Sequence, residues 1–166
     1  MSKSKSKTIL FLNGPNLNML GLRDKELYGK ETLASIVRRL KDYVEARPGY
    51  ALVAYQSNCS GDLITRINNA QNEGVVGIII NPGGLTHYDV GLRDSVDIAR
   101  SLGIPTVEVH LSDIDEREPR RHFSVLSPKP EDGMGEWVVI KRIAGKKSEG
   151  YFEGFDVLAQ RIENSG

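Results

Sequence analysis

The feature that most constrains the fold of this chain is the regular alternation of short apolar runs with amphipathic stretches along its length. Residues 8–13, 50–57, 75–81 and 106–112 have the length and composition of strands. Such alternation is typical of proteins in which helices connect parallel strands. Since residues 75–81 are almost wholly apolar, both faces of that strand should be covered, which places it at the centre of a sheet.

The stretches between these runs have helical periodicity. In residues 33–44 apolar side chains recur at helical spacing with charged residues on the opposite face, and Pro48-Gly49 ends the segment. Helices are also expected at residues 62–72 and 89–102. For the second of these, the spacing predicts the core residues Val90, Leu92, Val96, Ile98 and Ala99.

The last quarter of the chain has weaker patterns. Residues 137–143 alternate as a fifth strand would, and residues 151–162 fit a closing helix. Because no internal repeat or linker divides the chain, residues 1–166 are expected to form a single domain, with residues 1–7 as a disordered tail. Together these elements predict an α/β fold, a flavodoxin-like three-layer sandwich with a five-stranded parallel sheet.

Composition excludes several classes of protein. The 166 residues include 22 Lys and Arg against 22 Asp and Glu, so we expect no nucleic-acid partner. The longest apolar run, residues 75–80, is far shorter than the roughly 20 residues that cross a bilayer, so no membrane partner is expected. Residues 1–7 carry charge without the apolar core of a signal peptide, which predicts a cytoplasmic protein. The single cysteine, Cys59, cannot form an intrachain disulfide or a thiolate metal site.

Polar side chains follow the predicted strands at the end where a ligand would bind. In an open parallel sheet the loops after the strands converge at the carboxyl edge, and ligands bind there. Arginine, histidine, hydroxyl and amide side chains together suit an oxygen-rich carboxylate. The candidates by position are Asn16, Arg23 and Tyr28 after the first strand, Asn81 and His87 after the third, and His110, Ser112, Arg117 and Arg121 in or after the fourth.

Each of these residues also has an ordinary structural interpretation. Alone, His110 would more often be a hydrogen-bonded core histidine than a catalyst. Arg117 and Arg121 lie in a charged run that is typical of solvated surface. What favours a functional interpretation is that three strand ends, which the fold predicts to be neighbours, are all polar.

Other chemistries lack their characteristic residues. No phosphate-binding loop and no G-x-G-x-x-G motif after a strand is present, so no nucleotide cofactor is expected. A serine hydrolase would need an elbow of the G-x-S-x-G type, which is absent. A metal site at His87 and His110 would lack the tight spacing of metal ligands, so no metal is expected. Of the lysines, only Lys141 approaches the apolar setting that Schiff-base chemistry requires.

Four ordered blocks between residues 8 and 128 carry a more specific signal than any single motif. They are Asn13-Gly-Pro-Asn16-Leu with Leu20-Gly-x-Arg23 and Tyr28-Gly29; Gln56-Ser57-Asn58; Asn81-Pro-Gly-Gly-Leu-Thr86-His87 with Leu92-Arg93-Asp94; and Pro105-x-x-Glu108-Val-His110-Leu-Ser112 with Arg117-Glu118 and Arg121. With these blocks the chain resembles the type II 3-dehydroquinate dehydratases. The resemblance implies a cofactor-free lyase that dehydrates 3-dehydroquinate to 3-dehydroshikimate by anti elimination through an enolate, without a Schiff base.

The resemblance implies catalytic roles for particular residues. Tyr28 is similar to the general base that takes the proton beside the ketone, and Arg23 to its activator, because a nearby guanidinium favours the phenolate. Asn16 is similar to the asparagine that holds a water against the developing enolate oxygen. His110 is similar to the acid that protonates the leaving hydroxyl.

Other residues are similar to the family's binding and supporting set. Glu108 resembles the carboxylate that orients the acid, and Arg117 resembles the arginine that contacts the lid. Asp94, in family members, comes from a neighbouring subunit, so the resemblance implies a homo-oligomer, a dodecamer assembled from trimers. The residues that resemble the substrate-binding set are Asn81, His87, Asp94, Leu111, Ser112 and Arg121.

The sequence also departs from the family pattern. Asp24-Lys25 stands where Glu-Pro is usual, Arg120 replaces an aromatic residue, and residues 129–141 resemble an insertion before a short last strand. These changes bear on assembly and lid motion and leave the catalytic set intact. Two alternatives stay open, a non-catalytic module that binds small carboxylates and, with less support, a flavin-binding flavodoxin. A biosynthetic and a catabolic role are equally open.

Overall fold

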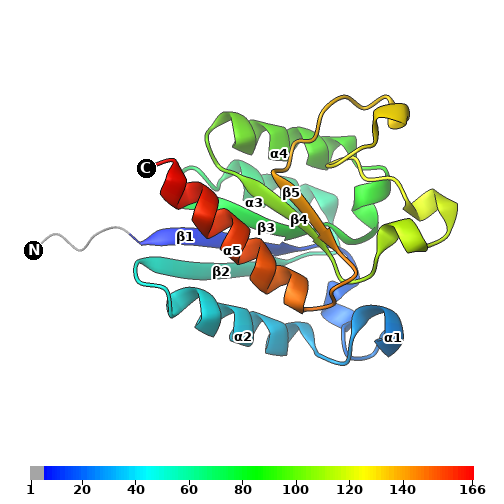
Figure 1. The fold of residues 1–166 in the computed structure, drawn as a ribbon, viewed down its shortest axis with the longest axis horizontal. Helices are drawn as coiled ribbons and strands as arrows, with labels where there is room; N and C mark the ends of the chain where they lie inside the picture. The colour runs from blue at the N-terminus through cyan, green and yellow to red at the C-terminus, as the bar shows by residue number, and fades with distance from the viewer. Residues whose placement is uncertain (1–5) are drawn as a thin grey trace, which may run out of the picture.

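A computed structural model describes residues 6–166, which form three layers, with one parallel sheet between two layers of helices (Figure 1). The strands are β1 (Lys7–Asn13), β2 (Tyr50–Gln56), β3 (Val75–Asn81), β4 (Thr106–His110) and β5 (Lys141–Ala144). They lie in the order β2-β1-β3-β4-β5, and every neighbouring pair is parallel. The predicted α/β fold with a five-stranded parallel sheet is confirmed, and the apolar run 75–81 is its central strand.

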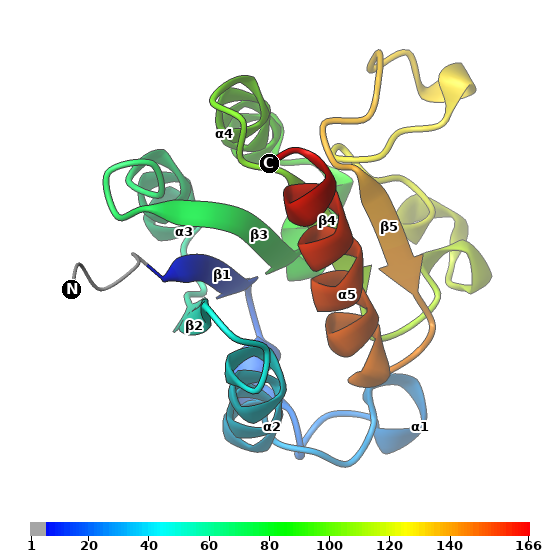
Figure 2. The same ribbon diagram turned by 60° about the vertical axis from the view of Figure 1, so that its left-hand side comes forward.

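Two pairs of helices cover the two faces of the sheet (Figure 2). Helices α2 (Leu33–Glu45) and α5 (Glu149–Asn164) pack on one face, and helices α3 (Ser60–Asn68) and α4 (Val90–Ser101) pack on the other. A short helix, α1 (Lys25–Tyr28), lies beyond the carboxyl end of the sheet. This arrangement leaves the carboxyl edge of the strands open to the loops that follow them.

Strand β1 shows why the sheet has two cores. Its successive side chains point to opposite faces, so Ile9 and Phe11 join the core beneath α2 and α5, whereas Leu10 and Leu12 join the core beneath α3 and α4. All of these side chains are fully buried. Burial on both faces explains why the strand has no polar alternation in its sequence.

Some predicted boundaries and faces are wrong. Residues 137–140 are loop and only Lys141–Ala144 is strand, because Val138 and Val139 are buried by loop packing rather than by ladder pairing. In α4, Val90 and Ile98 are half exposed, because helical spacing places them on the side away from the buried residues Leu92, Val96 and Ala99. Ser95 lies on the inward side and is buried instead.

The predicted disordered tail, residues 1–7, is too long at its end. Lys7 is the first residue of β1, and its backbone N–H donates to the Gly49 carbonyl at 2.7 Å. Pairing with β2 therefore extends the strand to Lys7. Residues 1–5 lie outside the described part of the chain.

The loops after β1 and β3 are in close backbone contact, which places the ends of both strands in one site. A Cβ atom on Gly14 would lie 2.4 Å from the carbonyl oxygen of Pro82. Gly83 has a φ of +58°, and a Cβ there would lie 2.9 Å from the carbonyl oxygen of Pro15. Glycine is required at both positions because any side chain would separate the two loops.

The segment that resembles an insertion forms a loop with a 3₁₀ turn at Pro130–Asp132, projecting at the end of the molecule near α4 (Figure 1). The Trp137 indole donates to the carbonyl of Pro128 at 2.9 Å. The guanidinium of Arg93, on α4, donates to the carbonyls of Val125 and Glu136, the second at 2.7 Å. Hydrogen bonds from the Arg93 side chain to these backbone carbonyls therefore hold the loop against α4.

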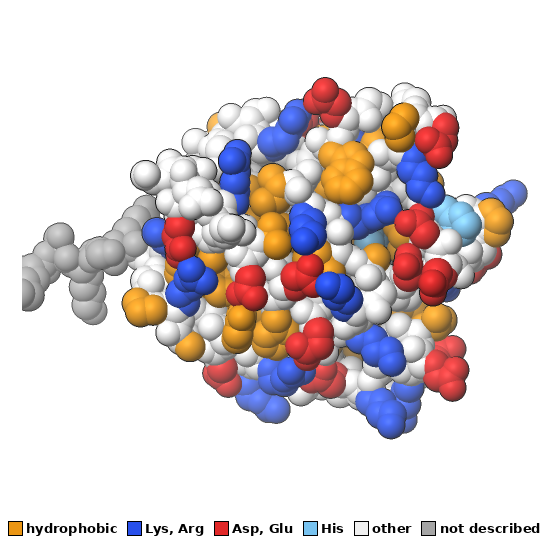
Figure 3. Space-filling model, viewed as in Figure 1, with side chains coloured by type: hydrophobic (Ala, Val, Ile, Leu, Met, Phe, Trp, Pro, Cys, Tyr) orange, Lys and Arg blue, Asp and Glu red, His pale blue; other side chains and the backbone are white. Residues whose placement is uncertain are grey.

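On the face that carries α5, basic and acidic side chains are interspersed (Figure 3). Ion pairs anchor this helix to its neighbours, including Arg47 with Glu163 at 2.8 Å and Lys141 with Glu153 at 3.3 Å. Within residues 6–166, every helix is too short or too polar to cross a bilayer.

Candidate active site

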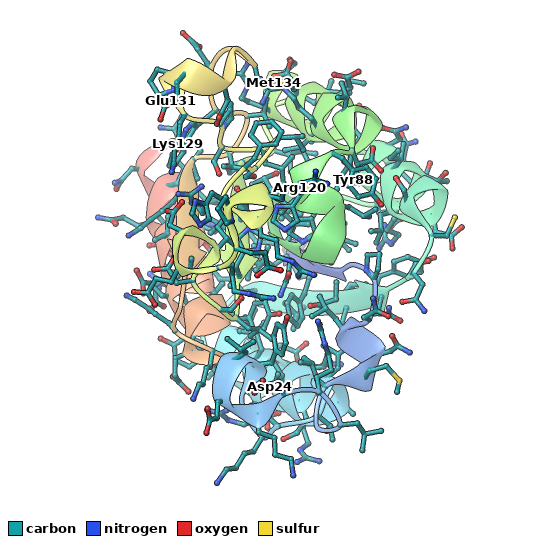
Figure 4. The ribbon with its side chains drawn as sticks, turned by 90° about the vertical axis from the view of Figure 1, so that its right-hand side faces the viewer. Asp24, Tyr88, Arg120, Lys129, Glu131 and Met134 are labelled. Atoms are coloured by element: carbon teal, nitrogen blue, oxygen red, sulfur yellow. The ribbon has the colours of Figure 1, made fainter. Side chains whose placement is uncertain are left out.

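A cavity of about 140 Å³ opens at the carboxyl ends of β1, β3 and β4, the end of the molecule that Figure 4 faces. Of the predicted site residues, only Glu108 and Asp94 are not among those that line it. The lining residues predicted from the sequence are Asn16, Arg23, Tyr28, Asn81, His87, His110, Leu111, Ser112, Arg117 and Arg121. The fold therefore brings three separate strand ends together, as the topology predicts.

Tyr28 lies between two arginines. The Arg117 guanidinium donates to the phenol oxygen of Tyr28 at 3.0 Å and to the Ser112 hydroxyl at 3.3 Å. The Arg23 guanidinium lies over the face of the Tyr28 ring, 3.8 Å from its centroid. The hydrogen-bonded cation at the phenol oxygen is thus Arg117, whereas Arg23 contacts the ring as a cation–π partner.

Helix α1, which carries Tyr28, is a single turn held by its own cap. The Asp24 carboxylate accepts from the backbone N–H groups of Glu26 at 2.9 Å and Leu27 at 3.2 Å. Gly29 ends the turn with a φ of +87°, which favours glycine. Asp24, one of the departures from the family pattern, therefore has a local structural role as an N-cap.

Glu108 is fully buried behind His110, and its carboxylate accepts hydrogen bonds from several side chains. His110 Nε2 lies 2.6 Å from Oε1, which also accepts from the hydroxyls of Thr86 at 2.8 Å and Ser124 at 2.6 Å. Ser127 donates to Oε2 at 2.5 Å. These donors form a cage that suits an ionised carboxylate, because a carboxylate has only acceptors.

The cage determines the charge of Glu108. Burial by itself would raise the pKa of this carboxyl group, but the charge and hydrogen bond of His110 and the hydrogen bonds of Ser124 and Ser127 outweigh burial and lower the pKa to about 2. Glu108 is therefore a carboxylate at neutral pH. Since it can only accept, His110 Nε2 must be the donor, which leaves Nδ1 as the ring nitrogen available to the cavity.

His87 also lines the cavity and is held by the backbone. Its Nδ1 lies 2.7 Å from the Phe123 carbonyl oxygen. Burial lowers the pKa of His87, and the hydrogen bond to that carbonyl only partly opposes it. His87 is thus suited to act as a neutral hydrogen-bonding group at neutral pH.

Asn16 has an unusual backbone conformation. Its φ is +66°, in the left-handed region, and its backbone N–H donates to the Asn58 carboxamide oxygen at 2.9 Å. Gln56 supports the same loop by donating to the Gly14 carbonyl at 3.2 Å and to Asn58 at 3.1 Å. The end of β2 therefore holds in place the residue that resembles the water-holding asparagine.

Asp94 does not reach the cavity of its own chain. It lies on the exposed side of α4 and is absent from the residues that line the cavity. This position agrees with its expected contribution to the site of a neighbouring subunit, which stays a prediction.

Sequence reasoning missed four side chains that support the site. Thr86, Ser124 and Ser127 hold Glu108, and Tyr151 bonds to Asn81. Thr86 lies inside one of the quoted blocks, and that position is the one sequence signal that could have marked it as a site residue. The other three lie outside the strand ends, where small hydroxyls and a helical tyrosine look like ordinary packing residues.

Within residues 6–166, the His, Cys, Asp and Glu side chains form no group of three or more that could hold a metal ion. The chemistry that the cavity offers by its own residues is acid–base chemistry. It has a phenol beside a guanidinium on one side and a histidine bonded to a buried carboxylate on the other.

Comparisons with known proteins all point to one family. A family model described as "Dehydroquinase class II" matches residues 7–159. A 3-dehydroquinate dehydratase of Janthinobacterium sp. (strain Marseille) is 46% identical over 157 residues, which are 95% of this chain and 99% of that protein. A catabolic 3-dehydroquinase of Botryotinia fuckeliana is 48% identical over 126 residues, 75% of this chain and 80% of that protein. The crystal structure of the type II dehydroquinase from Butyrivibrio crossotus has a TM-score of 0.83 at 36% identity and covers 94% of this chain and 99% of that one.

Proposed function

The chain belongs to the class II dehydroquinase family, and from this premise we propose that it removes water from 3-dehydroquinate to give 3-dehydroshikimate. The observation that best supports the proposal is the pairing, in one cavity, of a phenol bonded to an arginine with a histidine bonded to an ionised carboxylate. Such an elimination needs a base for a weakly acidic C–H group and an acid for the leaving hydroxyl.

In the proposed reaction Tyr28 is the general base. Its phenolate oxygen takes the proton from the carbon beside the ketone, and the electrons of the broken C–H bond move to the ketone oxygen to give an enolate. Arg117, at 3.0 Å from the phenol oxygen, stabilises negative charge on that oxygen. Arg23, over the ring, adds a second positive charge close to Tyr28.

Asn16 supports the enolate. In the proposal its side chain holds a water molecule against the ketone oxygen, where negative charge develops as the proton leaves. Its backbone is fixed by Asn58 in a conformation that few residues other than glycine adopt, which orients the side chain at the mouth of the cavity. A fixed donor stabilises the enolate without the cost of reorganising solvent during the reaction.

His110 is the general acid of the second half. As the enolate returns to a ketone, a carbon–carbon double bond forms, the C–O bond to the hydroxyl breaks, and that hydroxyl takes a proton from His110 and leaves as water. Glu108 orients the ring, because its carboxylate accepts a hydrogen bond from Nε2 at 2.6 Å. Exchange with solvent restores the proton of His110 and removes the one gained by Tyr28.

The predicted substrate-binding residues that line the cavity keep their binding roles in this proposal. Their amide, hydroxyl, imidazole and guanidinium groups are suited to hold the substrate's carboxylate and ring hydroxyls. These residues are Asn81, His87, Leu111, Ser112 and Arg121.

We also propose that the active form is a homo-oligomer, a dodecamer built from trimers, in which Asp94 of one subunit completes the site of the next. The exposed position of Asp94 on α4 supports this, as do the nearby apolar side chains of Tyr88 and Val90, which are 69% and 49% exposed. Exposed apolar side chains, such as that of Tyr88 on the end of the molecule that Figure 4 faces, suit a subunit contact. A scattering mass in solution tests this assembly. A cytoplasmic location stays a prediction from the sequence.

The turnover assay for this proposal follows absorbance by the conjugated enone of the product after mixing the purified protein with 3-dehydroquinate. We expect turnover, and borohydride treatment in the presence of substrate should leave it intact. Binding of 3-dehydroquinate without product would contradict the proposal and favour the non-catalytic module. Covalent trapping by borohydride would contradict the enolate route and favour lysine chemistry.

A further inference from the structure

Two asparagines at the carboxyl ends of β1 and β3 are bridged by one hydroxyl from helix α5, which packs on the sheet. Tyr151, in the first turn of α5, is fully buried. Its phenol oxygen lies 2.8 Å from Asn81 Nδ2 and 3.2 Å from Asn13 Oδ1. The ring makes an edge contact with Phe11, with centroids 4.7 Å apart. The hydroxyl therefore has a fixed position between two strand ends.

The hydrogen-bond partners determine the orientation of the Asn81 amide. Asn81 Oδ1 accepts from the backbone N–H of Gly83 at 3.1 Å, so a flipped amide would place two donors against each other. In the observed orientation Nδ2 donates to Tyr151, and the Tyr151 hydroxyl donates its own proton to Asn13. The donor and acceptor groups of the Asn81 amide are thus fixed by its two partners.

This chain of bonds concerns a residue of the cavity. Asn81 lines the cavity beside His110, whereas Tyr151 and Asn13 do not. One Nδ2 hydrogen of Asn81 is taken by Tyr151, and the second is left for a group in the cavity. The direction of that second hydrogen depends on the first, because both lie in the plane of the same amide.

We propose that Tyr151 is a positioning residue, which fixes the amide of Asn81 so that its second Nδ2 hydrogen donates to an oxygen of the bound substrate. The inference rests on the proposed function and deepens it by extending the substrate-binding set to a residue outside the cavity. Burial of the Tyr151 hydroxyl matters for this role. Deep in the protein no water replaces it, so its loss leaves Asn81 Nδ2 and Asn13 Oδ1 without the partner that both have in the wild type.

Substitution of Tyr151 by Phe removes the hydroxyl and keeps the ring. Because Asn81 is assigned to substrate binding, we expect KM for 3-dehydroquinate to rise about tenfold while kcat changes much less. A purely structural role for Tyr151 would reduce the amount of folded protein and the maximal rate and would leave KM unchanged. An unchanged KM in folded Tyr151→Phe overturns the inference.

Tyr50→Phe is the matched control. Tyr50 is buried in the same core and packs its ring against Phe155, but its hydroxyl faces Glu163 at 3.4 Å, at the opposite end of the sheet. We expect its KM to equal that of the wild type. A rise in KM as large as that of Tyr151→Phe would mean that any loss of a core hydroxyl disturbs the site, which also overturns the inference.

A second measurement needs neither turnover nor a folded variant. In the wild type, the two side-chain amide protons of Asn81 should differ by NMR, one protected from hydrogen exchange by Tyr151 and the other exchanging more rapidly. Equal, rapid exchange of both protons overturns the inference. If the wild type shows this asymmetry but no turnover, the proposed function fails while the positioning of Asn81 by Tyr151 stands.

Discussion

The Arg117 guanidinium donates a hydrogen bond of 3.0 Å to the phenol oxygen of Tyr28. The two residues are far apart in sequence, and the bond joins the segment after β4 to the short helix α1. Arg117 is itself held by Ser112 and by an ion pair with Glu118 at 3.4 Å. The position of Tyr28, the proposed base, therefore depends on the loop after β4, the strand that carries His110.

This relationship predicts the effect of removing each arginine. Arg117→Ala removes the donor to the phenol oxygen and should lower kcat about a hundredfold, with a smaller change in KM. Arg23→Ala removes the ring contact and should also lower kcat, but by less, because Arg23 does not bond to the oxygen. Steady-state kinetics checks both. Arg38→Ala, at an exposed position on α2, serves as the control. Unchanged kcat in both variants would show that neither arginine assists Tyr28 as the base.

The charge of Glu108 predicts a pH-dependent contribution to stability. Its pKa in the folded protein is about 2, below the ordinary 4.5, so its ionisation stabilises the fold above about pH 4.5, and this contribution is lost as the pH falls towards 2. The free energy of unfolding of Glu108→Gln, measured in urea, should be lower than that of the wild type at about pH 6, and the difference should shrink on acidification. A difference that is constant with pH would show that Glu108 is not held as a carboxylate.

The hydroxyl cage predicts that Ser127 matters although it does not line the cavity. Ser127 is the donor to Oε2 of Glu108, so Ser127→Ala leaves half of a buried carboxylate without a partner. The loss should cost about 1–3 kcal/mol of unfolding free energy and lower kcat several-fold through His110. Thermal unfolding and kinetics measure these effects. Ser101→Ala, on the exposed end of α4, should change neither. A wild-type unfolding free energy and kcat in Ser127→Ala would show that Glu108 does not depend on the Ser127 hydroxyl.

The proposed role of Asp94 predicts that activity depends on assembly. Asp94→Ala should lower activity although the residue lies outside the cavity of its own chain. Mixing Asp94→Ala with an inactive Tyr28→Phe protein, then dissociating and reassembling the subunits, should restore part of the activity, because some sites would receive both intact residues. The absence of any recovery in reassembled oligomers would argue against a shared site.

Much of the fold could be predicted from the sequence because its signals are local. The strand at 75–81 is almost wholly apolar, and the loops after β1 and β3 carry the glycines that the backbone contact needs. The fifth strand was misplaced because alternation at 137–140 reflects a loop whose Val138 and Val139 are buried by long-range packing. Exposure of Val90 and Ile98 follows from the helical spacing, which places both on the side of α4 away from the buried residues, so the error was to expect every apolar residue of this helix in the core.

The site residues also differ in how far the sequence alone could predict them. Residues at strand ends, such as Asn16, Asn81 and His110, could be predicted because the topology alone brings them together. Ser124 and Tyr151 could not, because their roles depend on hydrogen bonds to residues 16 and 70 positions away in the sequence. Both arginines contact Tyr28, but which of them bonds to the phenol oxygen and which lies over the ring depends on the conformation of the loops, which the sequence pattern does not give.

The most direct test of the central claim is kcat of Tyr28→Phe with 3-dehydroquinate, measured in assembled protein beside the wild type. The substitution removes only the phenol oxygen, so the fold and KM should stay close to those of the wild type, whereas kcat should fall by about a thousandfold if Tyr28 takes the proton. Tyr43→Phe, whose hydroxyl bonds to Asp156 far from the cavity, should retain full kcat. A Tyr28→Phe protein that turns over at the wild-type rate would contradict the account.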